Sequence, residues 1–233
     1  MIVVVPARGG SKGLTRKNVL PLAGVPLIQH TLKTALSARH VTRVIVSTDD
    51  DEITAVVKRI DGVEVPFRRP AELASDTSSA VDVYLHAADW LEATEGRPVG
   101  ALCALLPTSP LRLSADIDAA IECFIRNQAE VVLSVQQGKP LAWHQQMDPD
   151  SRLTALGNLS PQEAIANRQA HGPAPVVLNG SIYVLDLVAL RRTRTYFGPK
   201  TYGYLMPPER SVDIDGPDDF RLAEALLSVR SDT

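Results

Sequence analysis

Two short segments of the sequence carry the residue types that phosphate chemistry requires. The first, residues 7–18, reads Ala-Arg-Gly-Gly-Ser-Lys-Gly-Leu-Thr-Arg-Lys-Asn. Its three glycines allow the backbone to approach a ligand closely and to point N–H groups at it. Four cations fall within ten residues, at Arg8, Lys12, Arg16 and Lys17. Glycines and cations together predict a polyphosphate site.

Other interpretations of this segment fail on position or spacing. A solvated basic turn would not require three glycines after an apolar strand. Here the glycines do follow such a strand-like run, at residues 2–5. The P-loop pattern GxxxxGK[ST] is not matched. The dinucleotide pattern GxGxxG, followed at once by a helix, is not matched either. We therefore expect a phosphate-binding turn of another kind.

The second segment is the pair Asp213 and Asp215, which flank Ile214. In a strand, residues two apart share a face, so both carboxylates are expected to converge. Paired oxygen ligands, with phosphates supplying the rest, suit Mg²⁺. Turn and helix-cap chemistry is the alternative, and we assign it to Asp218 and Asp219. The spacing alone leaves both interpretations open for Asp213 and Asp215.

Alternating strands and helices must position these segments. Short apolar runs predict strands at residues 2–5, 43–47, 63–66, 101–106 and 131–135. Apolar residues at helical spacing predict helices that open at Pro26, cover 51–60, and include 80–91 and 117–125. This alternation predicts an α/β sandwich with a parallel sheet covered on both faces. Ligands of such sheets bind beyond the carboxyl ends of the strands, where residues 7–18 begin.

Residues 136–178 break the alternation, being rich in Gln, Pro, Asn and Ala. We predict that they leave the core as an arm, a lid or a dimer contact. Strands are expected again at 181–185 and 202–206, followed by a last helix from Asp218. The chain is thus predicted to be one domain, 1–233, with 136–178 as an insertion.

Composition narrows the class of protein. A chain of 233 residues can bury one sizeable core. Its net charge of −3 gives no basic field, so a nucleic-acid partner is not expected. The apolar start is too short to span a membrane, so no membrane partner is expected. Cys103 and Cys123 lie in apolar surroundings, which favours two buried, reduced thiols in a cytoplasmic protein.

Ordered blocks along the chain resemble one known family. They are PARGGSKG (6–13) with Lys17 and Asn18, STD (47–49), RPAELASDT (69–77), PTSPLR (107–112), NGSIY (179–183) and DID (213–215). The set resembles the acylneuraminate cytidylyltransferase family, the CMP-sialic acid synthetases. One block alone would be a weak signal, whereas the ordered set spans nearly the whole chain.

The resemblance implies a Rossmann-like three-layer nucleotidyltransferase fold, a homodimer, and transfer of CMP from CTP to a sialic-type sugar acid. It assigns Mg²⁺ to Asp213 and Asp215, and catalysis to these two residues with Arg8 and Lys12. The implied nucleotide-binding residues are Ala7, Arg8, Ser11, Lys12, Lys17, Asn18, Arg69, Asp76 and Ser79. The implied sugar-binding residues are Thr108, Ser109, Arg168, Asn179 and Tyr183.

The chain departs from many relatives at Leu106, where they carry a sugar-binding glutamine. The identity of the sugar acid is therefore open among sialic, pseudaminic and legionaminic acids, and 3-deoxy-octulosonic acid (KDO). KDO enzymes usually carry Arg-Leu-Pro after the serine of the first loop, where this chain has Lys12-Gly13-Leu14. A non-catalytic nucleotide-binding module and a Rossmann dehydrogenase are rivals of other classes. The carboxylate pair argues against the first, and the missing dinucleotide pattern argues against the second.

Overall fold

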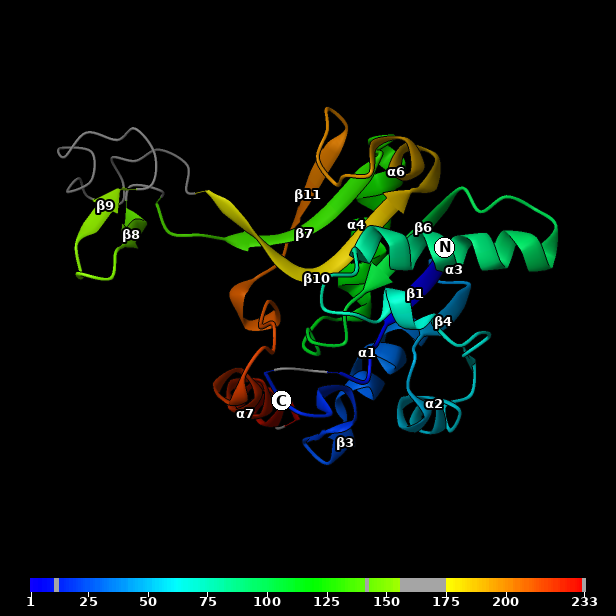
Figure 1. The fold of residues 1–233 in the computed structure, drawn as a ribbon, viewed down its shortest axis with the longest axis horizontal. Coiled ribbons are helices and arrows are strands. Elements are labelled where there is room, and N and C mark those ends of the chain that lie inside the picture. Colours follow the sequence, from blue (N-terminus) through cyan, green and yellow to red (C-terminus); the bar gives the residue numbers. More distant parts are fainter. Residues whose placement is uncertain (11–12, 141–142, 156–174, 232–233) are drawn as a thin grey trace.

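The apolar runs of the sequence become strands of one seven-stranded sheet (Figure 1). The computed structural model describes residues 1–10, 13–140, 143–155 and 175–231. In chain order the sheet strands are β1 (Ile2–Pro6), β4 (Arg43–Ser47), β5 (Val63–Glu64), β6 (Ala101–Leu105), β7 (Val131–Gln137), β10 (Val176–Asp186) and β11 (Thr201–Leu205). Their spatial order is β11-β7-β10-β6-β1-β4-β5. Only β10 runs antiparallel to its neighbours β6 and β7, so the predicted mostly parallel sheet is confirmed.

Helices cover both faces of the sheet because the side chains of each strand alternate between the faces. Val3 and Val5 of β1 pack with α1 (Leu27–Leu36), α2 (Asp51–Val57) and α4 (Ser114–Arg126). Val4, between them, packs on the other side with α3 (Ala80–Glu95) and α6 (Leu187–Thr193). The predicted three-layer sandwich is therefore confirmed.

A third, smaller core lies at one end of the sandwich. The last helix, α7 (Pro217–Ser231), places Ala223 against Leu22 and Leu27. Leu22 belongs to a short hairpin formed by β2 (Pro21–Leu22) and β3 (Val25–Pro26). Ile214 joins the same cluster with 0 % exposure, so the segment that carries the aspartate pair is anchored to this core.

The predicted insertion begins as a ribbon that extends the main sheet. β7 and β10 stay paired as far as Gln137 and Val176, so residues 136–137 and 176–178 belong to sheet strands. Beyond them a separate hairpin, β8 (Gln145–Met147) with β9 (Leu153–Ala155), lies away from the body (Figure 1). An arm is thus present, but its base is regular sheet because backbone pairing continues past the core.

Three local expectations differ from the structure. The second helix ends at Val57 rather than at residue 60, and α6 was not predicted. The aspartate pair was expected in a strand, but residues 211–215 lie in irregular backbone between a 3₁₀ turn (Pro208–Arg210) and α7. Ile214 donates its N–H to the Thr108 carbonyl (2.8 Å), so a loop contact rather than a sheet ladder fixes this segment.

Two expectations about chemistry and environment concern the whole chain. Cys103 and Cys123 are free and buried, as predicted. Among the described residues, no helix has both the length and the apolar character needed to cross a membrane.

Candidate functional site

A two-part cleft lies where β1 and β6 end. Pro6, Arg8 and Leu106 line both parts. One part, of about 310 Å³, extends to Lys17, Asn18, Thr108 and Asp215. The other, of about 270 Å³, extends to Arg69, Asp76 and Tyr84. The cleft is at the carboxyl edge of the sheet, where the parallel strands predict a ligand site.

The N-terminal turn, of which the structure describes residues 7–10 and 13–18, is tied to the sheet through its backbone. Ala7 is buried and donates its N–H to the Ser47 carbonyl at 2.9 Å. Asn18 is 6 % exposed, and its Nδ2 donates to the Arg8 carbonyl at 3.0 Å. The Arg8 guanidinium contacts the Asp76 carboxylate at 2.8 Å, across the second part of the cleft. Both ions are partly exposed, so this pair is weak and open to exchange with a ligand.

The turn and the aspartate pair meet in three dimensions, although about 200 residues separate them. A Cβ at Gly13 would lie 2.0 Å from the carbonyl oxygen of Asp215, so only glycine fits there. The Lys17 ammonium donates to the Ile214 carbonyl and lies 3.6 Å from the Asp215 carboxylate. Lys17 and Asp215 therefore share one wall of the cleft.

Asp213 is more buried than Asp215, and its charge is only partly compensated. The Asp213 carboxylate accepts a hydrogen bond from Thr108, but its buried Oδ1 has no partner among the described residues. Burial, and secondarily the neighbouring Asp215, raises the pKa of Asp213 above its ordinary value. The side chain of Asp215 is 86 % exposed. An unpartnered carboxylate oxygen beside a second carboxylate is suited to a hard cation.

The described residues contain no cluster of three or more His, Cys, Asp or Glu side chains that could hold a metal alone. A two-carboxylate set fits Mg²⁺ only when phosphate oxygens and water complete the shell, which is the usual arrangement for this ion. The residues present thus fit a cation that arrives together with a polyphosphate. Asp213 and Asp215 would be its protein ligands.

Arg69 lies beneath the second part of the cleft. It is 5 % exposed, and its Nε donates to Ser47 Oγ at 3.1 Å, while a second nitrogen donates to the Ser47 carbonyl. Burial lowers the pKa of Arg69 to about 10, which still leaves it charged at neutral pH. The predicted nucleotide residue is therefore a buried cation at the cleft, held by the end of β4.

Four of the predicted sugar-binding residues lie in different surroundings. Thr108 lines the cleft, whereas Ser109 is fully buried and its Oγ has no partner among the described residues. Asn179 is also buried; its amide donates to Ser211 Oγ (2.9 Å) and accepts from Ser134 Oγ (2.6 Å). Tyr183 stacks near Tyr196 with ring centres 5.4 Å apart. This geometry favours a positioning role for Asn179, and leaves Thr108 as the one of these four residues that lines the cleft.

Ser79, a predicted nucleotide-binding residue, lies at the start of α3 rather than in the cleft. Ser79 is the N-cap of α3, where its Oγ accepts the Val81 N–H at 3.2 Å. It does not line either part of the cleft. Ser11, Lys12 and Arg168 lie outside the described residues.

Arg112 belongs to the sequence block 107–112, but the sequence predicted no role for it. In the structure it has a structural role. It is 1 % exposed and donates to Ser181 Oγ (2.9 Å), Thr31 Oγ1 (3.0 Å) and the Leu106 carbonyl. Burial lowers the pKa of Arg112 to about 10. This arginine joins α1, β6 and β10 directly behind the cleft. The sequence offered one signal for this role, which was the position of Arg112 at the end of a Pro-bounded block that follows a buried strand.

A larger hollow of about 580 Å³ lies between α3 and α6, away from the strand ends. Its charges are satisfied within the protein: Arg191 pairs with Asp89 (2.6 Å) and Glu92 (2.9 Å), and Arg194 pairs with Asp82. This hollow lacks the glycine-rich turn and the uncompensated carboxylate, so it is not the candidate site.

The fold and the cleft define a nucleotidyltransferase, and comparisons with known proteins give its family. Residues 2–148 match the model of the cytidylyltransferase family. The chain is 31 % identical to a CMP-N,N'-diacetyllegionaminic acid synthase of Legionella pneumophila, over 100 % of this chain and 98 % of that protein. It is 36 % identical to N-acylneuraminate cytidylyltransferase B of Danio rerio, over 95 % of this chain and 50 % of that protein. This chain belongs to the cytidylyltransferase family and is a nucleotidyltransferase enzyme.

A solved structure supports the fold. A CMP:2-keto-3-deoxy-manno-octonic acid synthetase, complexed with CTP, superimposes with a TM-score of 0.69. The match covers 98 % of each chain at 18 % sequence identity. At that identity the likeness establishes the architecture alone, and the site must be argued from this chain's own residues.

Proposed function

We propose that this enzyme transfers CMP from CTP to a nonulosonic, sialic-type acid and releases pyrophosphate. One observation carries the proposal: Gly13 and Lys17 of the turn meet Asp215 in one wall of a single cleft, and the more buried Asp213 lies beside them, hydrogen-bonded to Thr108. A triphosphate needs cations and close backbone approach, and its reacting end needs a metal-binding carboxylate pair. The names of the two relatives support a nine-carbon acid as acceptor.

In the proposed reaction, the anomeric hydroxyl of the sugar acid attacks the α-phosphorus of CTP. A new P–O bond forms, and the bond between the α-phosphorus and the oxygen that bridges to the β-phosphate breaks. Pyrophosphate leaves with the negative charge, and the hydroxyl proton passes to water. Arg8 and Lys12, with backbone N–H groups of the turn, hold the β- and γ-phosphates and stabilise that charge. Lys17 stays beside the aspartates, where it limits their mutual repulsion.

Asp213 and Asp215 would hold Mg²⁺. When bound, the ion neutralises phosphate charge and favours the ionised form of nearby hydroxyls. Because Asp213 Oδ1 is buried without a partner in the described part of the chain, a cation at this point would relieve an existing desolvation cost. Replacing Asp215 by alanine is expected to abolish the Mg²⁺ dependence together with activity. An unchanged magnesium titration in that variant would exclude the assignment.

Our proposal for the acceptor acid rests on an apolar side chain in the cleft. Leu106 lines both parts of it, and its Cδ1 would lie 3.7 Å from a Cβ at Gly180. An apolar side chain there cannot accept or donate hydrogen bonds, so it favours an acceptor with a methyl or acyl group at this point. We therefore favour a nonulosonic acid over an octulosonic one. Thr108 and Arg168 remain the proposed polar contacts to the acid.

The decisive experiment is a panel of sialic, legionaminic, pseudaminic and octulosonic acids, each with CTP and Mg²⁺, scored by pyrophosphate release. UTP, ATP and GTP serve as nucleotide controls. We expect turnover with CTP and at least one nine-carbon acid. CTP binding without turnover on any acid would favour a non-catalytic nucleotide-binding module, and turnover on the octulosonic acid alone would favour the KDO assignment.

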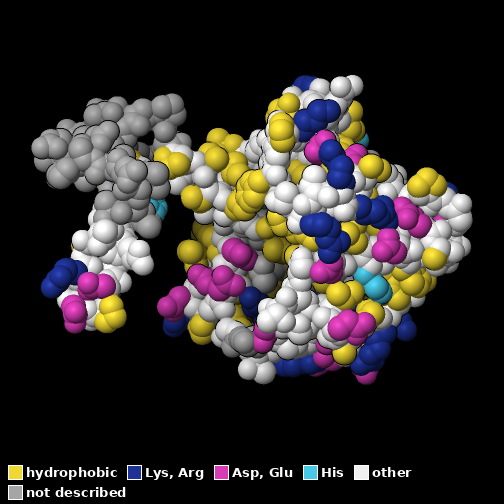
Figure 2. Space-filling view, turned by 45° about the horizontal axis from the view of Figure 1, so that its top comes forward, with side chains coloured by type: hydrophobic (Ala, Val, Ile, Leu, Met, Phe, Trp, Pro, Cys, Tyr) yellow, Lys and Arg dark blue, Asp and Glu magenta, His cyan; other side chains and the backbone are white. Residues whose placement is uncertain are grey.

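We also propose a homodimer, formed through the base of the arm. Val176, Leu178 and Leu205 lie on one face of the β11-β7-β10 ribbon, since Leu178 and Leu205 both pair with Val135. They are 55 %, 45 % and 60 % exposed. Figure 2 shows apolar side chains gathered where the arm leaves the body. The variant Leu178→Asp is expected to run as a monomer in light scattering; an unchanged mass would contradict this interface.

The proposed compartment is the cytoplasm, where thiols such as Cys103 and Cys123 stay reduced.

A further inference from the structure

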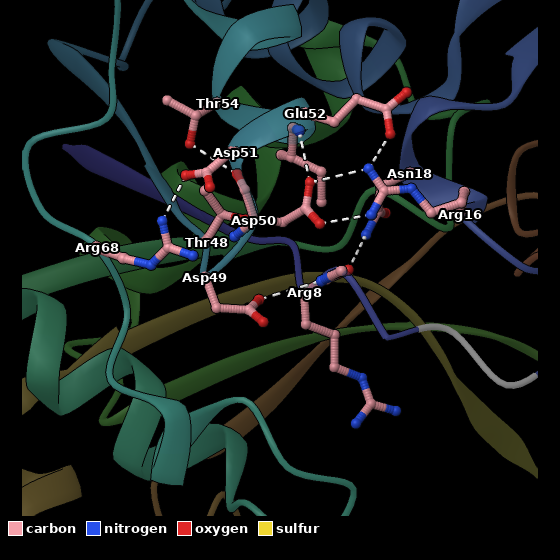
Figure 3. Close-up of polar contacts among 12 residues, drawn as sticks. Arg8, Arg16, Asn18, Thr48, Asp49, Asp50, Asp51, Glu52, Thr54 and Arg68 are labelled. Atoms are coloured by element: carbon pink, nitrogen blue, oxygen red, sulfur yellow. Dashed lines mark hydrogen bonds and ion pairs between the residues drawn. The ribbon is translucent and has the colours of Figure 1, made fainter.

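The N-terminal turn is fastened to the start of α2 by carboxylates that no sequence block assigned to the nucleotide. Asp49 and Asp50 follow β4 after Thr48, and Asp50 is the N-cap of α2. Asp49 accepts a hydrogen bond from the Gly9 N–H. Figure 3 shows Asp50 paired with Arg16. We call Asp49 and Asp50 the aspartate clasp.

The first end of the turn is held at Gly9. Asp49 Oδ1 accepts the Gly9 N–H at 3.1 Å, so this N–H is committed to the protein. A Cβ at Gly9 would lie 2.5 Å from Asp50 Oδ2, so glycine is required for the turn to lie against the second carboxylate. The close approach at Gly9 thus serves the clasp rather than a phosphate.

The second end is held at Arg16. Its guanidinium donates two hydrogen bonds to Asp50, one at 3.1 Å, and a further one to Glu52. Asp50 also accepts the Ile53 N–H at 2.9 Å, so both of its oxygens are occupied. The bonds from Arg16 hold the pKa of Asp50 below its ordinary value. Arg16 itself has a φ of 60°, a conformation that is unfavourable for a non-glycine residue and must be held by such contacts.

The clasp gives the two arginines of the turn different partners. Arg16 is turned to the aspartates and is committed there, while Arg8 points the other way, toward Asp76 (Figure 3). Asn18 completes the closure by holding the Arg8 carbonyl. Because Gly9, Arg16 and Asn18 are held in place, the backbone of Arg8 is fixed as well. Its side chain therefore extends from a defined position at the cleft.

We propose that Asp49, Asp50 and Arg16 are positioning residues for the nucleoside triphosphate: they pre-form the turn, and they act on the ligand only through it. The proposal rests on the proposed function, since it takes the turn as the nucleotide site. A ligand that binds only the ordered turn has an apparent Kd that rises in proportion as the ordered fraction falls. The sugar acid does not require the turn in this way.

The test compares Asp50→Asn, Arg16→Gln and the double variant with the wild type. Asparagine still caps α2 but removes the charge that Arg16 binds. Arg68→Gln is the matched control, because the Arg68–Asp51 pair is an ion pair at the same helix start that does not touch the turn. Kd for CTP is measured by titration calorimetry without acceptor, KM for both substrates by pyrophosphate release, and folding by thermal unfolding.

We expect each single variant to weaken CTP binding by about 5–10-fold, with KM for the acid and kcat within about two-fold, since ordering of the turn is all that changes. The double variant should lose no more than Arg16→Gln alone, because Asp50 holds this end of the turn through Arg16, whereas Arg16 also contacts Glu52. Arg68→Gln should bind CTP like the wild type. CTP affinity unchanged in the single variants, additive losses in the double variant, or an equal rise in KM for the acid would each overturn the clasp.

The calorimetry keeps this inference separate from the proposed function. If the wild type binds CTP but releases no pyrophosphate with any acid, the proposed reaction fails while the binding series still decides the clasp. If turnover is normal and the variants bind CTP as the wild type does, the clasp fails while the reaction stands.

Discussion

Two aspartate-bearing segments contact the N-terminal turn, and their carboxylates are in opposite states. At Asp50, both oxygens are occupied by Arg16 and the helix N–H, and the pKa lies below its ordinary value. At Asp213, one buried oxygen has no partner among the described residues, and the pKa lies above its ordinary value. Both residues are aspartates, but only the charge of Asp50 is compensated by neighbouring groups of the protein.

This difference separates structural from chemical roles. A carboxylate whose two oxygens are both occupied by protein donors fixes the geometry of its partners and is less available to a ligand. A buried carboxylate with an unused lone pair is costly until a cation or proton arrives, which is a common state at functional sites. The clasp is therefore expected to tune binding, and the Asp213–Asp215 segment to carry the chemistry.

The largest expected effect is at Asp213. Asp213→Asn should lower kcat by roughly 10²–10³-fold, by analogy with removal of one charge-stabilising contact. The fold should stay intact, because the substitution removes a poorly compensated buried charge. Pyrophosphate release and thermal unfolding measure the two effects.

Asp218→Asn is the control for that variant. Asp218 is 90 % exposed and pairs with Arg221 on the surface of α7, so its loss should leave kcat within about two-fold. Asp213→Asn with near-normal turnover, or with a loss of activity that follows a loss of folding, would remove the chemical role from this segment.

A smaller effect is expected where the turn meets the aspartates. Gly13→Ala should reduce activity by about 10–10²-fold, because its Cβ would lie 2.0 Å from the Asp215 carbonyl and must displace one wall of the cleft. Gly100→Ala is the control, since a Cβ there meets nothing within 4 Å and Gly100 lies just before β6, at the opposite edge of the sheet from the cleft. Equal activity of the two variants would show that the contact between turn and aspartates is not needed for turnover.

The smallest effect is a difference in how stability depends on pH. The lowered pKa of Asp50 contributes free energy of unfolding that is present above pH 3.8 and is lost as the pH falls through its folded pKa. The raised pKa of Asp213 acts in the opposite sense: its contribution is full below pH 3.8 and is lost as the pH rises through its folded pKa.

Denaturant unfolding of Asp50→Asn and Asp213→Asn, at pH values from 3 to 7, would measure this difference. At pH 7 Asp50→Asn should be less stable than the wild type by about 0.3–1 kcal/mol, and Asp213→Asn should be more stable. Both differences should shrink toward acid pH. The same sign for both variants at pH 7 would contradict the opposite states of the two carboxylates.

Much of the fold followed from the sequence because its apolar runs are short, continuous and separated by amphipathic helices. The strand at 43–47 was predicted with its observed bounds, and the mostly parallel sheet followed from the alternation. The helix α6 was missed because it is short and follows β10 without a break. The hairpins β2–β3 and β8–β9 were missed because strands of two or three residues carry no periodicity.

The site was predicted in part. Residue types and the order of blocks indicated the turn and the aspartate pair, but not the contact of Gly13 with Asp215, which depends on tertiary structure. The pair was expected in a strand, whereas a loop contact with Thr108 positions it. Arg16 was counted among the phosphate cations, yet it is committed to Asp50, because charge spacing alone does not show which carboxylate lies nearby.

A crystal structure with CTP and Mg²⁺ bound tests the central claim most directly. We predict one triphosphate between the N-terminal turn and the aspartate pair, with Arg8 and Lys17 beside its phosphates and a metal ion at Asp213 and Asp215. A nucleotide bound elsewhere, or a triphosphate that leaves Asp213 and Asp215 without a cation, would contradict it.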